Sequence, residues 1–438
     1  MKDEPKALWT LAWPVMMTTG ASMSLGVIDM IMVGRLGVTA IASLSVSVTW
    51  MYAVGVFGRN ISGGVEPLVS QAAGDKQTEI RGELFQHLLR LMCIVLIPQV
   101  LLYLNAENGL LLFGQQPEVS ELAGAYCSIL ALAVPAELLF FYSMRFFQAM
   151  ERVRSATVAV LAANVLNIVA NYIFIFILDL GVVGSAWASC LSTYGMCAIL
   201  LWGLRDDIRS FMSVYYTYSS SMLRKIWKLG WPTGLQFSLE VWGFVLSVLF
   251  AGWLGTESQA AHAIVLNVSS MCFMIPLGLS VAASTRVGKM IGTDGDWKKS
   301  IRTALFAMLI VEGAIICILF FCAPWLVEMY TDDPTLKEIA IPLLYLCALF
   351  QVFDGAQVVG LGILRGIGDV RTPLFFHLFA YWMVGMPLAL WLSFSQGYGV
   401  QGIWLGLAIA LAIVAILSGL RILYWMQKGV QSLYTIEE

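Results

Sequence analysis

The chain has 438 residues, of which 59% are hydrophobic and only 12% carry a charge. Soluble domains have about 25% charged residues, so this composition excludes a soluble protein and leaves no room for a separate soluble domain. The net charge of −3 is too small to indicate nucleic acid or any other partner. Apolar runs of about 20 residues, long enough to cross a bilayer as helices, follow one another almost throughout. The sequence therefore predicts an integral membrane protein.

Twelve apolar runs separated by turn signals predict an all-α protein with twelve transmembrane helices. A lipid-crossing strand needs only ~10 residues and alternates polar with apolar side chains, which these runs do not do. The first run is too long for the core of a signal peptide, so we expect it to remain as a helix. The predicted helices are 7–34, 38–65, 88–104, 121–144, 155–178, 181–204, 226–254, 258–285, 302–323, 338–362, 372–394 and 400–424.

The basic residues predict the orientation of these helices. With twelve helices, 22 of the 25 Lys and Arg residues fall on one side of the membrane. Basic residues stay on the cytoplasmic side, so both termini are expected in the cytoplasm. One helix more or fewer would destroy this alternation, which supports the count of twelve.

The sequence repeats at an offset of 218 residues. WTLAWP at 9–14 matches WKLGWP at 227–232, and GRLG at 34–37 matches GWLG at 252–255. Each half has six helices, an even number, so the halves are expected to be parallel repeats about an axis along the membrane normal, with a substrate site between them. We expect a six-helix lobe at 1–204, a cytoplasmic linker at 205–225 and a second six-helix lobe at 226–438.

Six carboxylates lie within or at the ends of the predicted spans, although an acid at mid-span costs ~2.5–3.5 kcal/mol on insertion scales. By the repeat, Glu240 precedes the position of Asp29 by seven residues, almost two helical turns, so both lie on nearly the same face of equivalent helices. Asp354 aligns with residue 136, beside Glu137. The six acids are Asp29, Glu66, Glu137, Glu240, Glu312 and Asp354.

The three strongest candidates are Asp29, Glu240 and Asp354. An apolar environment favours the protonated carboxyl group, whereas a bound cation favours the ionised one. Protonation or Na⁺ binding would neutralise such a pocket, and a cationic substrate would compete for the same charge. The alternative is an acid satisfied by neighbouring donors for packing alone; we favour the ion-coupling interpretation.

The other three acids are weaker candidates. For Glu137 the functional and structural interpretations are equally supported. Glu66 lies at the inner end of its helix and is compatible with the cytoplasmic interface. Glu312 is in a helix with no other cavity-type polar residue, and we expect it to be structural.

Three asparagines in the fifth predicted helix, Asn164, Asn167 and Asn171, follow an i, i+3, i+7 pattern and face one way. Carboxamide oxygens beside a carboxylate are good ligands for a hard cation, although asparagines also hold helices together by hydrogen bonds. We favour the ligand role for Asn167 and Asn171 and keep Asn164 as a secondary candidate.

An enzyme is not expected. The three histidines, His87, His262 and His377, lie in different segments and form no metal-binding motif. All eight cysteines lie in or beside apolar runs without a C-x-x-C pair, which is typical of small core residues. We therefore expect no cofactor.

Six motifs give the chain a resemblance to a known family: IDMIMVGRLG at 28–37, EPLVSQAAGD at 66–75, LNIVANYIF at 166–174, AAHAIVLNVSSM at 260–271, PLGLSVAASTRVGKMIG at 276–292 and LRGIGDVRTP at 364–373. Together they resemble the multidrug and toxic compound extrusion (MATE) family. The resemblance implies a V-shaped, two-lobe transporter of the inner (plasma) membrane. Such a protein exports small cationic, amphipathic drugs and dyes in exchange for Na⁺ or H⁺.

The resemblance also implies roles for the candidate residues. Asp29 would be the coupling acid of the N-terminal lobe, with Asn167 and Asn171 as its partners. Glu240 and Asp354 fit the cation site of the C-terminal lobe in the NorM branch, which places the chain nearest that branch. Members of that branch often have an acid where Asn171 stands, which implies weaker ion binding there. The resemblance is compatible with either Na⁺ or H⁺ as the coupling ion, and we prefer Na⁺, bound at Glu240 and Asp354.

The related superfamily offers an alternative, a flippase for lipid-linked saccharides. Its cavity should be basic in order to hold pyrophosphate, whereas the mid-span charges here are acidic apart from Arg59. A channel is disfavoured because two lobes with acidic pockets suggest alternating access. We expect a monomer whose partners are small organic cations and the lipid bilayer.

Overall fold

The computed structural model describes residues 4–74 and 78–434, and within these ranges it contains helices and no strand. Eleven helices are long and apolar enough to cross a membrane, and a bent pair, α6 (Pro117–Ala131) with α7 (Val134–Ala149), provides the twelfth if it is counted as one span. The predicted all-α, twelve-span architecture is confirmed in these terms.

The bent pair replaces the continuous helix expected at 121–144, so that prediction was wrong in detail. The two segments meet at 56°. Pro135 lies in the first turn of α7, where its missing N–H group and its ring prevent continuation of the preceding helix. As a result, Glu137 lies in the first turn of a new helix rather than in mid-helix.

The chain forms two compact units. The N-terminal unit is Met17–Gly234, and the C-terminal unit is Leu235–Glu438 together with Met1–Met16. Both boundaries cut a long helix, α1 (Glu4–Val33) and α11 (Ser220–Trp253), and they are 218 residues apart. These limits differ from the predicted lobes of 1–204 and 226–438, whose role as moving bodies stays a prediction.

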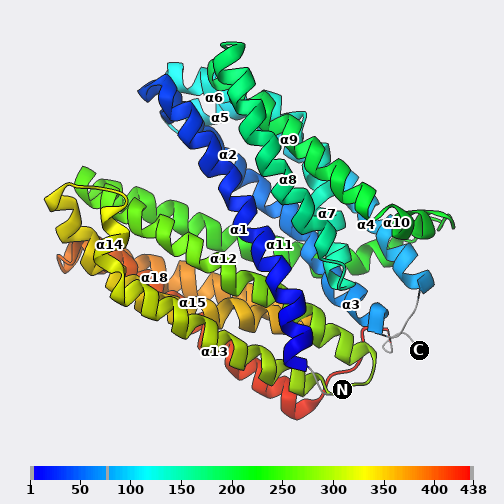
Figure 1. Cartoon of the computed structure of the whole chain (residues 1–438). Helices are drawn as coiled ribbons and strands as arrows, with labels where there is room; N and C mark the ends of the chain where they lie inside the picture. The colour runs from blue at the N-terminus through cyan, green and yellow to red at the C-terminus, as the bar shows by residue number, and fades with distance from the viewer. Residues whose placement is uncertain (1–3, 75–77, 435–438) are drawn as a thin grey trace. The chain divides into compact units, whose positions relative to one another are not determined.

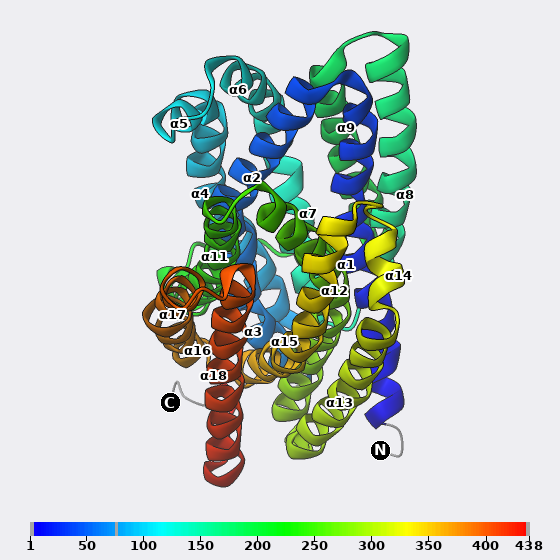
Figure 2. The same cartoon turned by 90° about the vertical axis from the view of Figure 1, so that its left-hand side faces the viewer.

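The N-terminal unit has a core around Leu44, Tyr126 and Ile175. Within it, α8 packs along α9, and the short helices α5 and α6 meet at one end (Figures 1 and 2). Besides its parts of α1 and α11, and α6 and α7, it contains η1 (Gly34–Leu36), α2 (Val38–Ile61), η2 (Ser62–Val65), α3 (Glu66–Gly74), α4 (Thr78–Leu104), α5 (Ala106–Leu112), α8 (Arg154–Asn171), η3 (Tyr172–Ile177), α9 (Gly181–Gly203) and α10 (Arg205–Met212).

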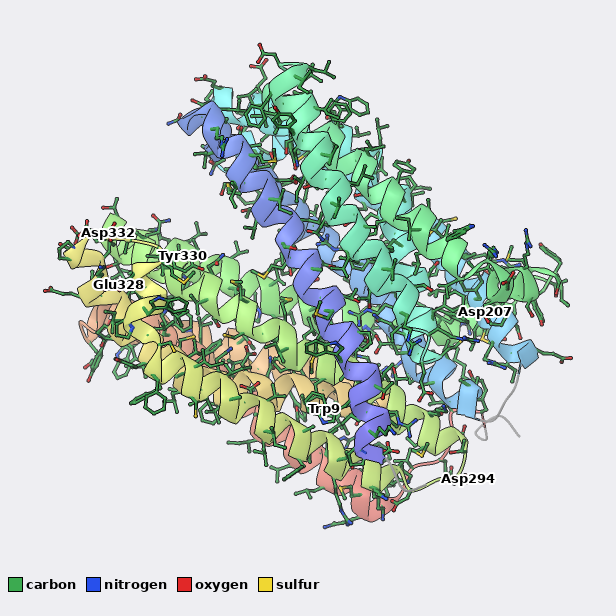
Figure 3. All side chains as sticks on the ribbon, viewed as in Figure 1. Trp9, Asp207, Asp294, Glu328, Tyr330 and Asp332 are labelled. Carbon is green, nitrogen blue, oxygen red and sulfur yellow. The ribbon has the colours of Figure 1, made fainter. Side chains whose placement is uncertain are left out.

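The C-terminal unit has a core in which the rings of Phe350 and Trp404 meet edge to face at 5.3 Å. Its long helices run between two polar ends, one with Asp294 and the other with Glu328 and Asp332 (Figure 3). Besides its parts of α1 and α11, it contains α12 (Thr256–Gly292), α13 (Trp297–Phe321), α14 (Ala323–Glu328), α15 (Pro334–Ile367), α16 (Arg371–His377), η4 (Leu378–Gly385), α17 (Met386–Leu390), η5 (Trp391–Ser395) and α18 (Gly399–Lys428).

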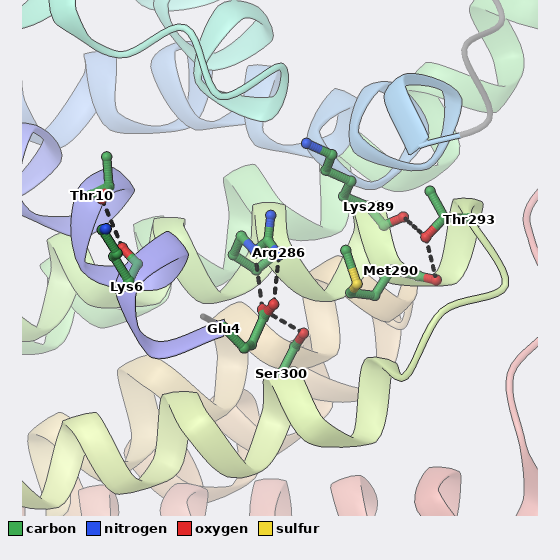
Figure 4. A network of polar contacts seen from close by, with 8 residues as sticks. All are labelled: Glu4, Lys6, Thr10, Arg286, Lys289, Met290, Thr293 and Ser300. Carbon is green, nitrogen blue, oxygen red and sulfur yellow. Dashed lines mark hydrogen bonds and ion pairs between the residues drawn. The ribbon is translucent and has the colours of Figure 1, made fainter. Parts of the chain in front are cut away.

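An ion pair fixes the start of α1 to the C-terminal unit (Figure 4). The Glu4 carboxylate accepts hydrogen bonds from Arg286 Nε at 3.0 Å and Nη2 at 2.6 Å, and from Ser300 Oγ at 2.7 Å. A carboxylate held by both nitrogens of a guanidinium group has a defined geometry as well as a strong attraction. This contact explains why Met1–Met16 belongs to the unit formed by α12 and α13.

The segment predicted as a linker, 205–225, is packed onto the N-terminal unit. It contains α10 and the first turns of α11. Between them the backbone is held by side chains of α4: Gln86 Nε2 donates to Val214 O at 2.7 Å, and Arg90 Nη2 donates to Tyr216 O at 2.6 Å. This connection therefore has defined hydrogen bonds within one unit.

Glycines at equivalent positions show that the sequence repeat is also a structural one. Gly37 and Gly255 have φ of 112° and 116°, and Gly181 and Gly399 have φ of 56° and 55°, values that side chains disfavour. The wide π-helical turns η3 and η5 precede the second pair and share hydrogen bonds at the same offset: Leu180 N to Phe174 O, and Tyr398 N to Leu392 O. The two halves thus use the same backbone framework.

One segment breaks this symmetry. In the C-terminal unit, η4 (Leu378–Gly385) forms wide π-helical turns, whereas the equivalent residues 160–167 lie within the regular helix α8. Such π-helical turns are frequent at functional sites. The departure from the repeat lies directly after His377.

We predict that Gly362→Ala destabilises the C-terminal unit. A Cβ at Gly362 would overlap the backbone and side chain of Ser280 in α12, and overpacking costs about 1–3 kcal/mol. Thermal unfolding of the purified protein should show a lower midpoint. Gly419→Ala in α18 is the matched control, because a Cβ there has no atom within 4 Å. Equal midpoints for the two variants would contradict the close α12–α15 packing.

Candidate functional site

The structure brings Asp29 together with Asn167 and Asn171, the two partners that the family resemblance implies for it. Asp29 is 6% exposed, and Asn171 Nδ2 donates to its Oδ1 at 2.6 Å. The same amide group donates to Asn167 Oδ1 at 3.0 Å. The spacing of the asparagines along α8 therefore places both amides at one carboxylate of α1.

Ser189 of α9 completes this group and was missed by the sequence analysis. Its Oγ donates to Asp29 Oδ2 at 2.6 Å. No motif or repeat partner marked this serine, because its role comes from the packing of α9 against α8. The Oδ1 atom of Asn171 is buried and has no hydrogen-bond partner among the described residues.

Asn164 lies on the same side of α8 but does not bond to Asp29. Its Nδ2 donates to the carbonyl oxygen of Ala21 at 2.9 Å, and its Oδ1 accepts a hydrogen bond from Ser24 Oγ at 2.9 Å. These contacts join α8 to an earlier turn of α1. Asn164 therefore joins two helices in this structure, and its secondary ion role stays a prediction.

Glu240 and Asp354 also lie together, in the C-terminal unit, where they are 7% and 4% exposed. Gln357 connects them, because its Nε2 donates to Glu240 Oε1 at 2.9 Å and lies 3.4 Å from Asp354 Oδ1. His377 Nε2 lies 3.7 Å from Glu240 Oε2, and its ring stacks on Tyr381 at 5.6 Å. This group combines residues of α11, α15, α16 and η4.

Several polar atoms in this second group lack a hydrogen bond within residues 4–74 and 78–434. Gln357 Oε1, His377 Nε2 and Tyr381 OH are buried without a hydrogen bond among the described residues. Gln357 could have been found from the sequence, because it follows Asp354 by three residues on one helix face. His377 was considered only as a catalytic or metal-binding residue, so its position beside an acid was missed.

In the part of the chain that the structure describes, no Lys or Arg forms an ion pair with Asp29, Glu240 or Asp354. The oxygens of these acids and of the neighbouring amides suit a hard cation such as Na⁺. Over residues 4–74 and 78–434, no three or more His, Cys, Asp and Glu side chains are arranged to hold a metal ion. The donor set thus fits a weakly held alkali cation better than a transition metal.

The secondary candidates Glu137 and Glu66 are compensated by arginines. Arg59 Nη1 lies 2.8 Å from Glu137 Oε1, and Arg145 Nη1 lies 3.1 Å from Glu66 Oε1. The Arg59 guanidinium group also lies over the ring of Tyr52, 5.2 Å from its centroid. The charges of both acids are therefore neutralised inside the N-terminal unit, and the mid-span Arg59 has a partner.

The fold and the site define a class of protein: a multi-span membrane protein built from two repeats, each with a buried acidic group. The sequence signature of the MatE family matches residues 14–173 and again residues 232–391, at the offset of 218 found within the sequence. The chain belongs to the MatE family. Its family and fold are those of membrane transporters, not of enzymes.

Relatives cover nearly the whole chain. It is 30% identical over 430 residues to a probable multidrug resistance protein NorM of Brucella suis, covering 94% of this chain and 91% of that protein. It is 31% identical to the multidrug resistance protein NorM of Burkholderia vietnamiensis, covering 94% and 92%. It is 28% identical to the human multidrug and toxin extrusion protein 1, covering 95% and 74%.

Solved structures share the fold. The eukaryotic MATE transporter AtDTX14 superposes with a TM-score of 0.87 at 24% identity, covering 96% of this chain and 95% of that one. A MOP superfamily transporter from Pyrococcus furiosus superposes with a TM-score of 0.87 at 20% identity, covering 98% and 97%. The fold is therefore shared by proteins of low sequence identity.

We predict that Arg59→Gln destabilises the N-terminal unit by about 3 kcal/mol, because it leaves the Glu137 carboxylate without its partner in a poorly solvated position. The double variant Arg59→Gln with Glu137→Gln should recover most of this loss. A double-mutant cycle from thermal unfolding in detergent measures the coupling. Additive effects of the two substitutions would contradict the ion pair.

Proposed function

We propose that the chain is a secondary active antiporter of the inner membrane that exports small cationic, amphipathic drugs and dyes in exchange for Na⁺ or H⁺. The observation that carries this proposal is the pair of buried acidic groups, around Asp29 and around Glu240 and Asp354, with no Lys or Arg paired to them in the described residues. The family, and the multidrug resistance names of its relatives, support the same conclusion.

The coupling follows from charge compensation. A buried carboxylate without a fixed positive partner is unstable unless a mobile cation is bound. An organic cation and the coupling ion therefore compete for the same negative charge, and each leaves when the other arrives. Alternating exposure of the acids to the two sides of the membrane turns this competition into exchange.

Na⁺ is the preferred coupling ion. Glu240 and Asp354 offer carboxylate oxygens, and the unpartnered Oε1 of Gln357 adds a neutral oxygen, which together form a set for a hard cation. In the N-terminal unit, Asp29 accepts hydrogen bonds from Asn171 and Ser189, and the unpartnered Oδ1 of Asn171 adds a neutral oxygen beside it. The chain is expected to act as a monomer with both termini in the cytoplasm.

The alternative, a flippase for lipid-linked saccharides, requires a cavity of the opposite charge. The fold does not decide this point, since the transporter from Pyrococcus furiosus is described as having a binding pocket of reverse polarity that suggests a different function. The mid-span basic residue Arg59 is paired with Glu137 and is not free to hold pyrophosphate. The uncompensated charge is acidic, which favours cationic cargo.

We predict that Glu240→Gln, Asp354→Asn and Asp29→Asn each reduce ion-dependent ethidium export to the background of cells that lack the protein. Each substitution keeps the shape of the side chain and removes the charge for which ion and drug compete. Export is measured as the decrease of ethidium fluorescence in cells loaded with the dye.

Glu257→Gln is the matched control, because Glu257 is an exposed acid in the first turn of α12. It should export ethidium as the unchanged protein does. All variants should elute as single peaks in size-exclusion chromatography, which shows that folding is retained. Full export by Glu240→Gln or by Asp354→Asn would refute the role of the C-terminal acids.

A further inference from the structure

Glu312 of α13 is a buried acid with no partner. It is 3% exposed, and neither carboxylate oxygen has a hydrogen bond among the described residues. A buried acid kept only for packing should be satisfied by donors, because burying an unpaired carboxylate is costly. The structural role expected from the sequence does not explain this arrangement.

A second side chain without a hydrogen bond among the described residues, Gln351, lies near Glu312. Gln351 of α15 is 0% exposed, and neither its amide nitrogen nor its oxygen forms a hydrogen bond with the described residues. Gly355, one turn further along α15, lies directly against the Glu312 carboxylate, which a Cβ at that position would overlap. Glu312 and Gln351 therefore lie where α13 and α15 pack together.

Asp354 connects this place to the group around Glu240. At 100° per residue, Gln351 and Gly355 lie to one side of Asp354 on α15, and Gln357 lies to the other side. Asp354 shares the amide of Gln357 with Glu240, and it directly precedes Gly355, which lies against the Glu312 carboxylate. The three acids thus form a series across α15, with Asp354 in the middle.

The chemistry of these side chains indicates the ligand. Carboxylate and carboxamide oxygens bind hard cations. Within the described ranges no Lys or Arg pairs with Glu312, and no group of three or more His, Cys, Asp and Glu is arranged around a metal. Such a site has one acid of its own, Glu312, one acid, Asp354, that is shared with the group around Glu240, and the neutral amide of Gln351. This set matches a singly charged ion better than a divalent one.

We propose that Glu312, Gln351 and Asp354 form a second alkali-cation site in the C-terminal unit, on the side of α15 away from Gln357, and that it takes Na⁺. The inference rests on the proposed cation-coupled transport, since it makes Asp354 a ligand common to two sites. A shared ligand lets an ion pass from one site to the other without losing its carboxylate partner.

The test is equilibrium binding of radioactive Na⁺ to the purified full chain in lipid nanodiscs. Glu312→Gln should remove about one bound Na⁺ per chain or weaken one class of sites by about tenfold or more. The double variant Glu240→Gln with Glu312→Gln should bind less Na⁺ than either single variant.

Two glycine variants separate the site from a general effect on the helices. Gly355→Ala keeps the acid but places a methyl group where its carboxylate lies, so it should reproduce the loss seen with Glu312→Gln. Gly313→Ala, next to Glu312 and with no atom within 4 Å of its Cβ, should bind Na⁺ as the unchanged protein does.

Unchanged Na⁺ binding in Glu312→Gln, or no Na⁺ binding by the unchanged protein, would overturn the inference. Ethidium export is measured in parallel. If the unchanged protein binds Na⁺ through Glu312 but exports no drug, the proposed function fails and the site stands. If export is normal and Glu312→Gln binds like the unchanged protein, the site fails and the function stands.

Discussion

The arrangement of charges in this protein follows from the free-energy cost of burying an ionised carboxylate. The chain compensates the charge of its buried acids in two ways. Glu137 and Glu66 have permanent partners, since an arginine of the same unit lies within 3.1 Å of each. Among the described residues, Asp29, Glu240 and Asp354 have neutral hydrogen-bond donors or a histidine beside them and no Lys or Arg in an ion pair. The first group stabilises the fold, whereas the second has an incomplete charge balance that a mobile cation can complete.

The repeat supplies a common framework in which the two acidic groups differ. Equivalent glycines with positive φ and equivalent wide turns give both halves the same helix ends. On this framework the N-terminal unit surrounds one acid with donors from Asn171 and Ser189. The C-terminal unit instead places two acids around Gln357, beside a histidine that precedes a segment without a counterpart. Two similar backbones thus present sites of different charge and different donors.

Sequence patterns predicted the parts of this account that depend on regular spacing. Twelve spans, the repeat, and the common face of Asn167 and Asn171 follow from helix length, from a constant offset and from the pitch of a helix. The pairing of these asparagines with Asp29 came from the family resemblance instead. The bend at Pro135 was missed because a proline near a helix start and one within a bent span look alike in a sequence.

The sequence analysis also failed to predict contacts between helices that are distant in sequence. Ser189 and His377 carry no signal of their own, and their roles come from the neighbours that tertiary packing provides. Glu312 shows that a missing contact is equally hard to predict from the sequence. Its sequence context suggested a structural acid, whereas only the packed structure shows that no donor from the described part of the chain bonds to it.

The most direct test of the central claim is dye transport by the purified chain in proteoliposomes, with a Na⁺ gradient or a pH gradient imposed separately. If mobile cations complete the charge balance of the buried acids, an imposed Na⁺ gradient should drive ethidium movement against the ion, and collapsing that gradient should stop it. Ethidium movement at the same rate with no gradient of either ion would contradict the account.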